Sequence, residues 1–264
     1  MSRPLAAITG ASSGIGAVFA RKLAARQHDV LLVARRRDRL EPLCAELQRD
    51  HGISANFLEA DLAEPDALEA VAVRLASEPR LALLVNNAGF GTKGRFHEVP
   101  YEDQARMHRL HIDAILRLTR AALPGMVSRN SGAIINVSSV AAYARTPGNV
   151  SYCATKAWVS AFTEGIYLEM RNLGADVAIQ ALCPGYTYSE FHDVLKVDRS
   201  SIAGQWLWMS AEDVVEASLQ ALPSRRLFVI PGWQYRLLTM IVPRLPSAWR
   251  LAIEAKSPAR RDKI

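Results

Sequence analysis

The sequence has few cysteines and no long uninterrupted apolar run. Cys44, Cys153 and Cys183 are odd in number and widely spaced, with no Cys-x-x-Cys pair. We therefore expect neither a disulfide framework nor a zinc site, and a reducing cytoplasm fits this cysteine usage. The first strand-like run begins within five residues of Met1, so no export signal is expected there, and no segment offers the ~20 consecutive apolar residues of a membrane span.

The positive charge is not gathered into a nucleic-acid motif. The chain has 32 basic and 26 acidic residues, a formal net charge of +6. Most of the basic residues are scattered over predicted helices or collected near the C-terminus. Neither a helix-turn-helix signature, an RNA-binding aromatic motif nor a zinc finger is found, so we expect no nucleic-acid partner.

No linker, internal repeat or low-complexity tract divides the 264 residues, half of which are hydrophobic. A chain of this length can bury one full core. Apolar runs alternate with amphipathic helical stretches, which predicts βαβ units. We expect one α/β domain over residues 1–232, a doubly wound parallel Rossmann-type sheet with helices on both faces. Strands are predicted at residues 5–9, 30–34, 55–58, 81–86, 133–138, 177–182 and 227–230.

A Gly-rich turn at residues 9–16 follows the first predicted strand and precedes a predicted helix at residues 17–25. In such a strand-turn-helix segment, glycines let the backbone approach a pyrophosphate at the helix N-terminus. The spacing Gly10-x3-Gly14-x-Gly16 differs from the common G-x-G-x-x-G, and a mere flexible turn is the alternative. The surrounding elements favour dinucleotide binding.

Tyr152 and Lys156 are four residues apart in a predicted helix at residues 152–173. This spacing places phenol and ammonium on one helix face. A nearby cation is expected to lower the tyrosine pKa from its usual ~10, which makes the phenol a usable proton donor and acceptor. Taken alone, the pair is more typical of a solvated helix face. Ser139, thirteen residues before Tyr152, and the Gly-rich turn favour a catalytic role.

Together with three further signatures, these residues resemble the short-chain dehydrogenase/reductase family, single-domain branch, over residues 5–232. The signatures are Asn86-Asn87-Ala88-Gly89, Asn136-Val137-Ser138-Ser139 and Pro184-Gly185, each closing an apolar run. The resemblance implies hydride transfer between a nicotinamide cofactor and a carbonyl or secondary alcohol.

In this family pattern Tyr152 is the proton donor and acceptor, and Lys156 holds the nicotinamide ribose. Ser139 hydrogen-bonds the substrate oxygen. Ser138 is the alternative for this role, but the spacing of Ser139 to Tyr152 favours Ser139. The alternative function is a redox-sensing, NADP-binding protein with little or no turnover.

The resemblance also assigns cofactor contacts position by position. The pyrophosphate turn comprises Gly10, Ser12, Ser13, Gly14, Ile15 and Gly16. The remaining contacts are Asp61 and Leu62 for adenine, Asn87, Gly89, Tyr152 and Lys156 for ribose and nicotinamide, and Pro184, Gly185 and Thr187 for the carboxamide. Ser189 stands where relatives often carry threonine.

The residues after the second predicted strand favour NADP over NAD. An acid at this position would bind a ribose 2′-hydroxyl, whereas an arginine accommodates a 2′-phosphate. Here Ala34 is followed by Arg35 and Arg36, which can make charge-assisted, bidentate contacts with phosphate. Arg37 fits better as a polar residue that opens the predicted helix at residues 38–47.

His111 departs from the family pattern, because relatives carry an asparagine here that completes a proton relay to the lysine. A histidine also donates and accepts hydrogen bonds, so it could replace that asparagine. A purely structural histidine is the alternative. His108 lies three residues away, but no further ligands accompany the pair, and we expect no metal site.

The segment at residues 189–209 covers the substrate in this family. Its Trp206 and Trp208 suggest a hydrophobic ketone or alcohol, or else simply anchor the loop. Helices predicted at residues 102–123 and 152–173 carry broad apolar surface, and in relatives their equivalents contact a second subunit, so we expect a homodimer or homotetramer.

Residues 233–264 are expected to form an amphipathic extension packed on the same domain, shielding the pocket or a neighbouring subunit. Membrane-surface attachment is the alternative, because basic residues accompany Trp233 and Trp249. Pro243 and Pro246 interrupt the long helix that such attachment would favour.

Overall fold

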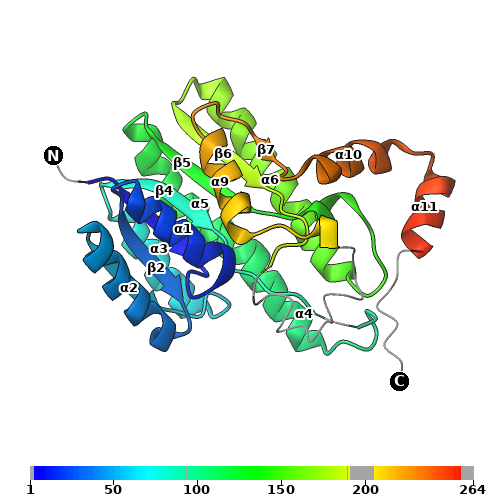
Figure 1. Cartoon of the computed structure of the whole chain (residues 1–264), viewed down its shortest axis with the longest axis horizontal. Helices are drawn as coiled ribbons and strands as arrows, with labels where there is room; N and C mark the ends of the chain where they lie inside the picture. The colour runs from blue at the N-terminus through cyan, green and yellow to red at the C-terminus, as the bar shows by residue number, and fades with distance from the viewer. Residues whose placement is uncertain (1–2, 93, 189, 191–204, 257–264) are drawn as a thin grey trace.

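The computed structural model describes the chain except residues 1–2, 93, 189, 191–204 and 257–264 (Figure 1). Seven strands form one parallel sheet in the order β3-β2-β1-β4-β5-β6-β7. The strands are β1 Leu5–Thr9, β2 Asp29–Ala34, β3 Ala55–Glu59, β4 Leu81–Asn86, β5 Gly132–Val137, β6 Val177–Leu182 and β7 Phe228–Val229. The predicted doubly wound sheet is confirmed, although β7 is shorter than expected.

Helices cover both faces of the sheet (Figure 1). On one face, α1 (Gly14–Ala25), α2 (Arg37–His51) and α9 (Ala211–Ala221) share a buried apolar cluster with the strands. On the other face, α3 (Pro65–Ala76), α5 (Ala114–Ser128) and α6 (Val150–Leu173) do the same. The strand order reverses between β1 and β4, which is where dinucleotides bind in open sheets of this kind, beyond the carboxyl ends of the strands.

The helix predicted at residues 102–123 contains an irregular turn. It comprises α4 (Tyr101–His108), a π turn at Arg109–Asp113 and then α5. The amide of Ala114 donates to the carbonyl of Arg109, five residues back. Such π turns occur frequently at functional sites, and this one contains His111.

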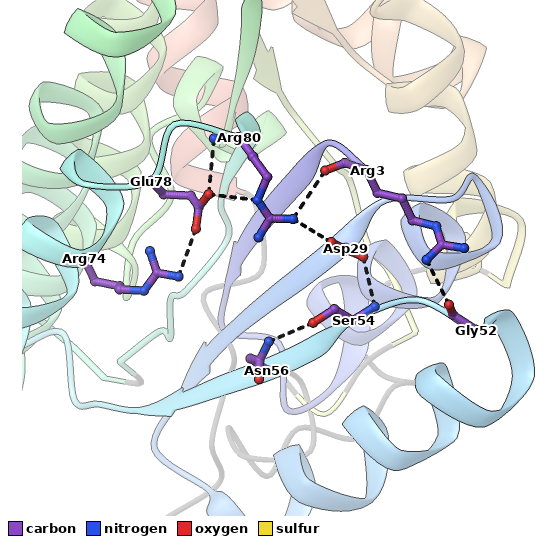
Figure 2. Close-up of polar contacts among 8 residues, drawn as sticks. All are labelled: Arg3, Asp29, Gly52, Ser54, Asn56, Arg74, Glu78 and Arg80. Carbon is purple, nitrogen blue, oxygen red and sulfur yellow. Dashed lines mark hydrogen bonds and ion pairs between the residues drawn. The ribbon is translucent and has the colours of Figure 1, made fainter. Parts of the chain in front are cut away.

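The amino ends of the strands are closed by an ion-pair network around Arg80 (Figure 2). Its guanidinium binds the buried carboxylates of Asp29, at 2.7 Å, and Glu78, at 3.2 Å. Asp29 also accepts a hydrogen bond from the amide of Ser54 at 2.9 Å. These polar groups bind one another at the amino edge of the sheet. The predicted site residues, such as Gly10 after β1 and Ser139 after β5, lie at the opposite, carboxyl edge.

Beyond β7 the chain continues as α10 (Trp233–Ile241), a short 3-10 turn at Val242–Arg244 and α11 (Ser247–Lys256). These elements extend outward from the sheet (Figure 1). Pro243 lies in the 3-10 turn and Pro246 directly precedes α11, so the two prolines divide the extension into two short helices.

Candidate active site

Ser139, Tyr152 and Lys156 come together at the carboxyl edge of the sheet. Ser139 follows β5 and caps the 3-10 turn Val140–Tyr143, its Oγ accepting the amide of Ala141 at 3.1 Å. It is also hydrogen-bonded to Tyr152 on α6. Lys156, one turn further along α6, is buried, and its Nζ lies 5.8 Å from the centre of the Tyr152 ring. The structure thus places an alcohol, a phenol and an amine around one point.

The neighbouring serine is committed to the interior. Ser138 is 3% exposed, and its Oγ donates to the carbonyl of Lys156 at 2.8 Å and contacts the hydroxyl of Ser160 at the same distance. Ser139 is only half-buried. Of the two serines, therefore, Ser139 is the one positioned to meet a substrate oxygen.

The pKa shifts in this cluster have an unexpected direction. Burial raises the pKa of Tyr152 to about 12, although the hydrogen bond with Ser139 acts to lower it. Burial also lowers the pKa of Lys156 to about 8. The expectation that Lys156 would lower the tyrosine pKa is wrong for this structure, because desolvation of the phenol is the largest influence and the hydrogen bond that acts to lower the pKa comes from Ser139. Nζ of Lys156 instead donates to the carbonyl of Val137 at 2.9 Å. The phenol accordingly holds its proton at neutral pH.

His111 is fully buried beside Tyr152, with ring centres 5.8 Å apart. Its Nε2 accepts a hydrogen bond from the amide of Phe90 at 3.2 Å, and its Nδ1 lies 3.0 Å from Oγ1 of Thr155. Both ring nitrogens are therefore used within the protein. Gly89 is required next to this ring, since a Cβ there would meet Nε2 of His111 at 2.8 Å. This arrangement favours the structural alternative for His111.

The Gly-rich turn can accept a pyrophosphate. Gly10 has φ +66°, and a Cβ there would lie 2.8 Å from the backbone of Ala88, so a larger residue is excluded. Asn87 fixes the turn, because its Nδ2 donates to the carbonyl of Thr9 at 2.9 Å. The helix α1 begins at Gly14, and the amides of its first turn lack helical partners, which suits an anion. The residues present fit the phosphates of a dinucleotide.

The two arginines after β2 have different surroundings. Arg35 is 62% exposed, with Nη1 3.9 Å from Oδ2 of Asp61. Arg36 donates to the hydroxyls of Ser12 and Ser13, at 3.0 and 2.8 Å, and pairs with Glu190 at 2.9 Å. Arg35 is thus the more accessible cation, and Arg36 ties the Gly-rich turn to a residue far along the chain.

Other predicted positions have structural contacts. Leu62 is buried, and Asp61 pairs with Arg106 on α4 as well as with Arg35. Asn86 and Asn136, which belong to two of the family signatures, bind each other in the interior, with 2.9 Å between Nδ2 of Asn86 and Oδ1 of Asn136. They therefore join β4 to β5 rather than facing the site.

The loop after β6 is held by the C-terminal helices. Pro184 follows Cys183 at the end of the strand, and the buried Thr187 donates to the carbonyl of Gly185 at 3.1 Å. A Cβ on Gly185 would overlap the ring of Tyr235 from α10. Tyr235 in turn accepts the amide of Tyr186 at 3.0 Å.

In the predicted substrate-covering segment, Ser189 and residues 191–204 lie outside the described residues. Trp206 is 67% exposed, whereas Trp208 is buried and packs 5.0 Å from the ring of Tyr188. The anchoring alternative therefore holds for Trp208 alone.

Among the residues that contact the predicted site but were not identified from the sequence are Thr9, Arg106, Thr155 and Glu190. Thr9 alone had a local signal, because it opens the Gly-rich turn, and its hydroxyl accepts the amides of Asn87 and Ala88 at 2.9 and 3.0 Å. The other three bind residues at least 44 positions away in the sequence, apart from the hydrogen bond of Thr155 to the carbonyl of Tyr152.

Comparisons with known proteins agree with this geometry. Residues 4–199 match the family model for short chain dehydrogenases. A solved short-chain dehydrogenase from Sphingobium yanoikuyae in complex with NADPH is 34% identical, with a TM-score of 0.82 over 93% of this chain and 97% of that one. The bulky-bulky ketone specific alcohol dehydrogenase from Comamonas testosteroni is 28% identical, with a TM-score of 0.79 over 94% of this chain and 97% of its own.

Among curated proteins, the very-long-chain 3-oxoacyl-CoA reductase of Anas platyrhynchos is 31% identical over 72% of this chain. That match spans 62% of the reductase, so it leaves more than a third of the relative's length uncovered. Within the described part of the chain, none of the helices combines the length and hydrophobicity needed to cross a bilayer.

Proposed function

The chain belongs to the short-chain dehydrogenase/reductase family of oxidoreductases, and from this membership we propose that it interconverts a carbonyl and a secondary alcohol with NADP(H). The observation that carries the proposal is the meeting of Ser139, Tyr152 and Lys156 beside a Gly-rich turn that fits a pyrophosphate. The dinucleotide, when bound, supplies or accepts the hydride.

The chain's own residues orient the substrate and move the proton. The hydroxyl of Ser139 donates a hydrogen bond to the substrate oxygen, where negative charge develops during reduction. The phenol of Tyr152 then gives its proton to that oxygen, and in oxidation it takes the proton back. A phenol with a pKa of about 12 is protonated at neutral pH, which suits the donor role in reduction. Lys156 would hold the hydroxyls of the nicotinamide ribose when the dinucleotide is bound.

The preference for NADP rests on Arg35 and Arg36. No carboxylate directly follows Ala34, and the exposed guanidinium of Arg35 is available for a 2′-phosphate. Arg36 is already bound to Ser12 and Ser13, so it places a second cation against the Gly-rich turn. The NADPH complex of the Sphingobium relative supports this choice.

We propose a hydrophobic ketone or alcohol as the substrate. The exposed rings of Tyr188 and Trp206 lie after β6, next to the loop assigned to the carboxamide, and provide apolar surface on the substrate side. The names of the relatives, which act on bulky ketones or on long-chain oxoacyl groups, point in the same direction.

A second subunit is proposed for the outer surface of α5 and α6. A groove between these helices is lined by apolar side chains including Leu116, Leu123, Phe162 and Ile166. This supports the expected homodimer or homotetramer.

The cytoplasm stays our prediction for the cellular compartment. The three cysteines, Cys44, Cys153 and Cys183, are free and buried, and this suits a reducing compartment.

The redox-sensing alternative is less favoured, because a sensor without turnover would not need the serine, tyrosine and lysine in one cluster. The test is a panel of ketones and alcohols of increasing bulk, monitored by NADPH absorbance with the purified protein. We expect turnover on hydrophobic members of the panel. No turnover on any of them, despite NADPH binding, would favour the sensor.

The same assay tests the proton donor. Tyr152→Phe keeps the ring but removes the transferable proton, so turnover should fall by roughly 10²-fold or more while NADPH still binds. Tyr167→Phe, about four turns further along the same helix, is the matched control and should leave turnover unchanged. Near-normal turnover of Tyr152→Phe would show that another group donates the proton.

A further inference from the structure

The helix α10 turns its apolar stripe away from the protein. Four large side chains recur at the spacing of one helix face, and all are at least 44% exposed: Trp233, Leu237, Met240 and Ile241. The opposite face carries Tyr235 and Thr239, which are buried against the domain. A surface helix of a globular protein usually directs its apolar stripe inward. This helix does the reverse.

The helix α11 shows the same inversion. Trp249 and Ile253, four residues apart, are 68% and 51% exposed. The residue that faces inward is a carboxylate, because Glu254 is 5% exposed and its Oε1 accepts the amide of Arg145 at 3.1 Å. Polar contacts thus hold both helices on the domain, and their apolar residues remain uncovered. We call residues 233–256 the C-terminal arm.

Positive charge is concentrated in the same part of the sequence. Residues 233–264 contain seven basic and two acidic residues, so they carry +5 of the net +6 of the whole chain. One of the two acids, Glu254, is buried. The surface that offers tryptophans and aliphatic side chains therefore belongs to a strongly cationic segment.

We propose that the C-terminal arm attaches the protein to the surface of an anionic lipid bilayer. Helices with Trp and aliphatic residues on one side, accompanied by arginines and lysines, lie in the headgroup region with the apolar face inserted. Each basic residue near an anionic surface strengthens binding further. The bend at Pro243 and Pro246 is compatible with this role, because both short helices expose a stripe of their own.

A second copy of the chain fits this surface less well than a bilayer. Self-association through the arm would bring together two segments that each carry a net charge of +3 over residues 233–256, and like charges disfavour contact. An anionic bilayer instead offers both the negative charge and the apolar layer that the exposed residues require.

The arm also contacts the loops around the candidate site. Tyr235 packs on Gly185, and Glu254 binds the backbone of Arg145 between Tyr143 and α6. A bilayer at the arm would consequently lie near the substrate side. This consequence rests on the proposed function, whereas the attachment itself does not.

The test compares vesicle binding of the full chain with that of Trp233→Ser/Trp249→Ser. The protein is sedimented with vesicles of phosphatidylcholine and phosphatidylglycerol, about three to one, and with phosphatidylcholine alone. We expect binding to the anionic vesicles to be at least about tenfold tighter than to the neutral ones, and to weaken as salt is raised. The double variant should lose at least about tenfold of the anionic binding.

Tyr101→Ser is the matched control, because Tyr101 is a 78% exposed aromatic on α4 outside the arm, and it should bind vesicles normally. Thermal melting verifies that the double variant is folded, and light scattering gives its mass. Equal binding of the double variant and the full chain would overturn the proposal. A lack of vesicle binding by the full chain would overturn it as well. If, in that case, the double variant had a lower oligomer mass than the full chain, the arm would be assigned to contact with a second copy. These outcomes are independent of turnover, so they can be told apart from failure of the proposed reaction.

Discussion

Nδ1 of His111 lies 3.0 Å from Oγ1 of Thr155, and this pair links the π turn to the helix that carries the candidate proton donor. Because Nε2 accepts the amide of Phe90, the proton of the neutral ring is on Nδ1 and is donated to Thr155. Thr155 in turn donates to the backbone carbonyl of Tyr152 at 2.9 Å. His111 therefore holds the loop after β4 and the start of α6 in fixed positions.

We expect His111→Leu to lower turnover, because it leaves the Phe90 amide and the Thr155 hydroxyl without their partner. His111→Asn should be tolerated, since an amide also offers one acceptor and one donor and restores the group that relatives carry. Turnover on a substrate found with the ketone panel is the measurement. His108→Asn, at an exposed position of the same helix, is the control. If the leucine variant were as active as the native chain, His111 would have no role in positioning Tyr152.

His111 should also make stability depend on pH. Burial holds the pKa of His111 well below its ordinary value of 6.5, so below that pH the unfolded chain takes up a proton that the folded chain excludes. The free energy of unfolding should consequently fall as the pH drops below about 6.5, and His111→Asn should reduce this fall. Urea unfolding at several pH values measures it. His28, whose pKa burial also lowers, is present in both proteins and cancels in the difference.

The sequence allowed the sheet to be predicted because most of its strands are buried on both faces. All residues of β1 and β2 are buried, so these strands appear as continuous apolar runs with clear ends. The π turn at Arg109–Asp113 has no such signal, since nothing in its composition distinguishes it from the flanking helix. It became visible only where His111 meets Phe90 and Thr155.

The residues of the candidate site could be identified by family pattern, but their electrostatics could not. The direction of the Tyr152 pKa depends on how far the ring is desolvated, which spacing along a helix does not reveal. The ion pair of Arg36 and Glu190 joins residues that are 154 positions apart, so no local sequence pattern predicts it.

Arg35 should decide the choice of cofactor. We expect NADPH to bind at least about tenfold more tightly than NADH, a difference of ~1.4 kcal/mol, because the exposed guanidinium can bind the 2′-phosphate. Arg35→Ala should remove most of this preference. Fluorescence titration of both nucleotides measures it. Arg37→Ala is the control, since Arg37 pairs with Glu41 at 3.6 Å and should not affect the preference. Equal affinities in the native chain would contradict the assignment.

Glu190 should oppose NADPH binding. Its carboxylate pairs with Arg36 at 2.9 Å, and this hydrogen bond lowers the pKa of Glu190, so the group is anionic at neutral pH. Glu190→Gln frees Arg36 and removes a charge that repels phosphate. Since the pair is partly exposed, we expect NADPH to bind about two- to fivefold more tightly. Glu46→Gln, which breaks the Arg21–Glu46 pair between α1 and α2, should leave the affinity unchanged. Weaker NADPH binding by Glu190→Gln would mean that the pair orders the site.

Lys156 should reduce the stability of the protein without its cofactor. Burial lowers the pKa of Lys156 from 10.5 to about 8, so at pH 8 and below its folded ammonium is disfavoured relative to the unfolded one. At ~1.4 kcal/mol per pKa unit this amounts to roughly 3 kcal/mol. Lys156→Met removes that term but leaves the carbonyl of Val137 without a donor, which costs about 1 kcal/mol.

We therefore expect Lys156→Met to be inactive yet about 2 kcal/mol more stable than the native chain at pH 7, as judged by urea unfolding without nucleotide. The sign of the pH dependence provides a second check. Between pH 8 and about 10.5 the native chain should gain stability as the pH rises, because in this interval the unfolded lysine still binds a proton that the folded lysine has already released. The advantage of the variant should shrink over the same interval. Lys22→Met, at a half-buried lysine that pairs with Glu216 at 2.8 Å, should give no gain. A variant less stable than the native chain at pH 7 would show that Lys156 is held by more than the Val137 carbonyl.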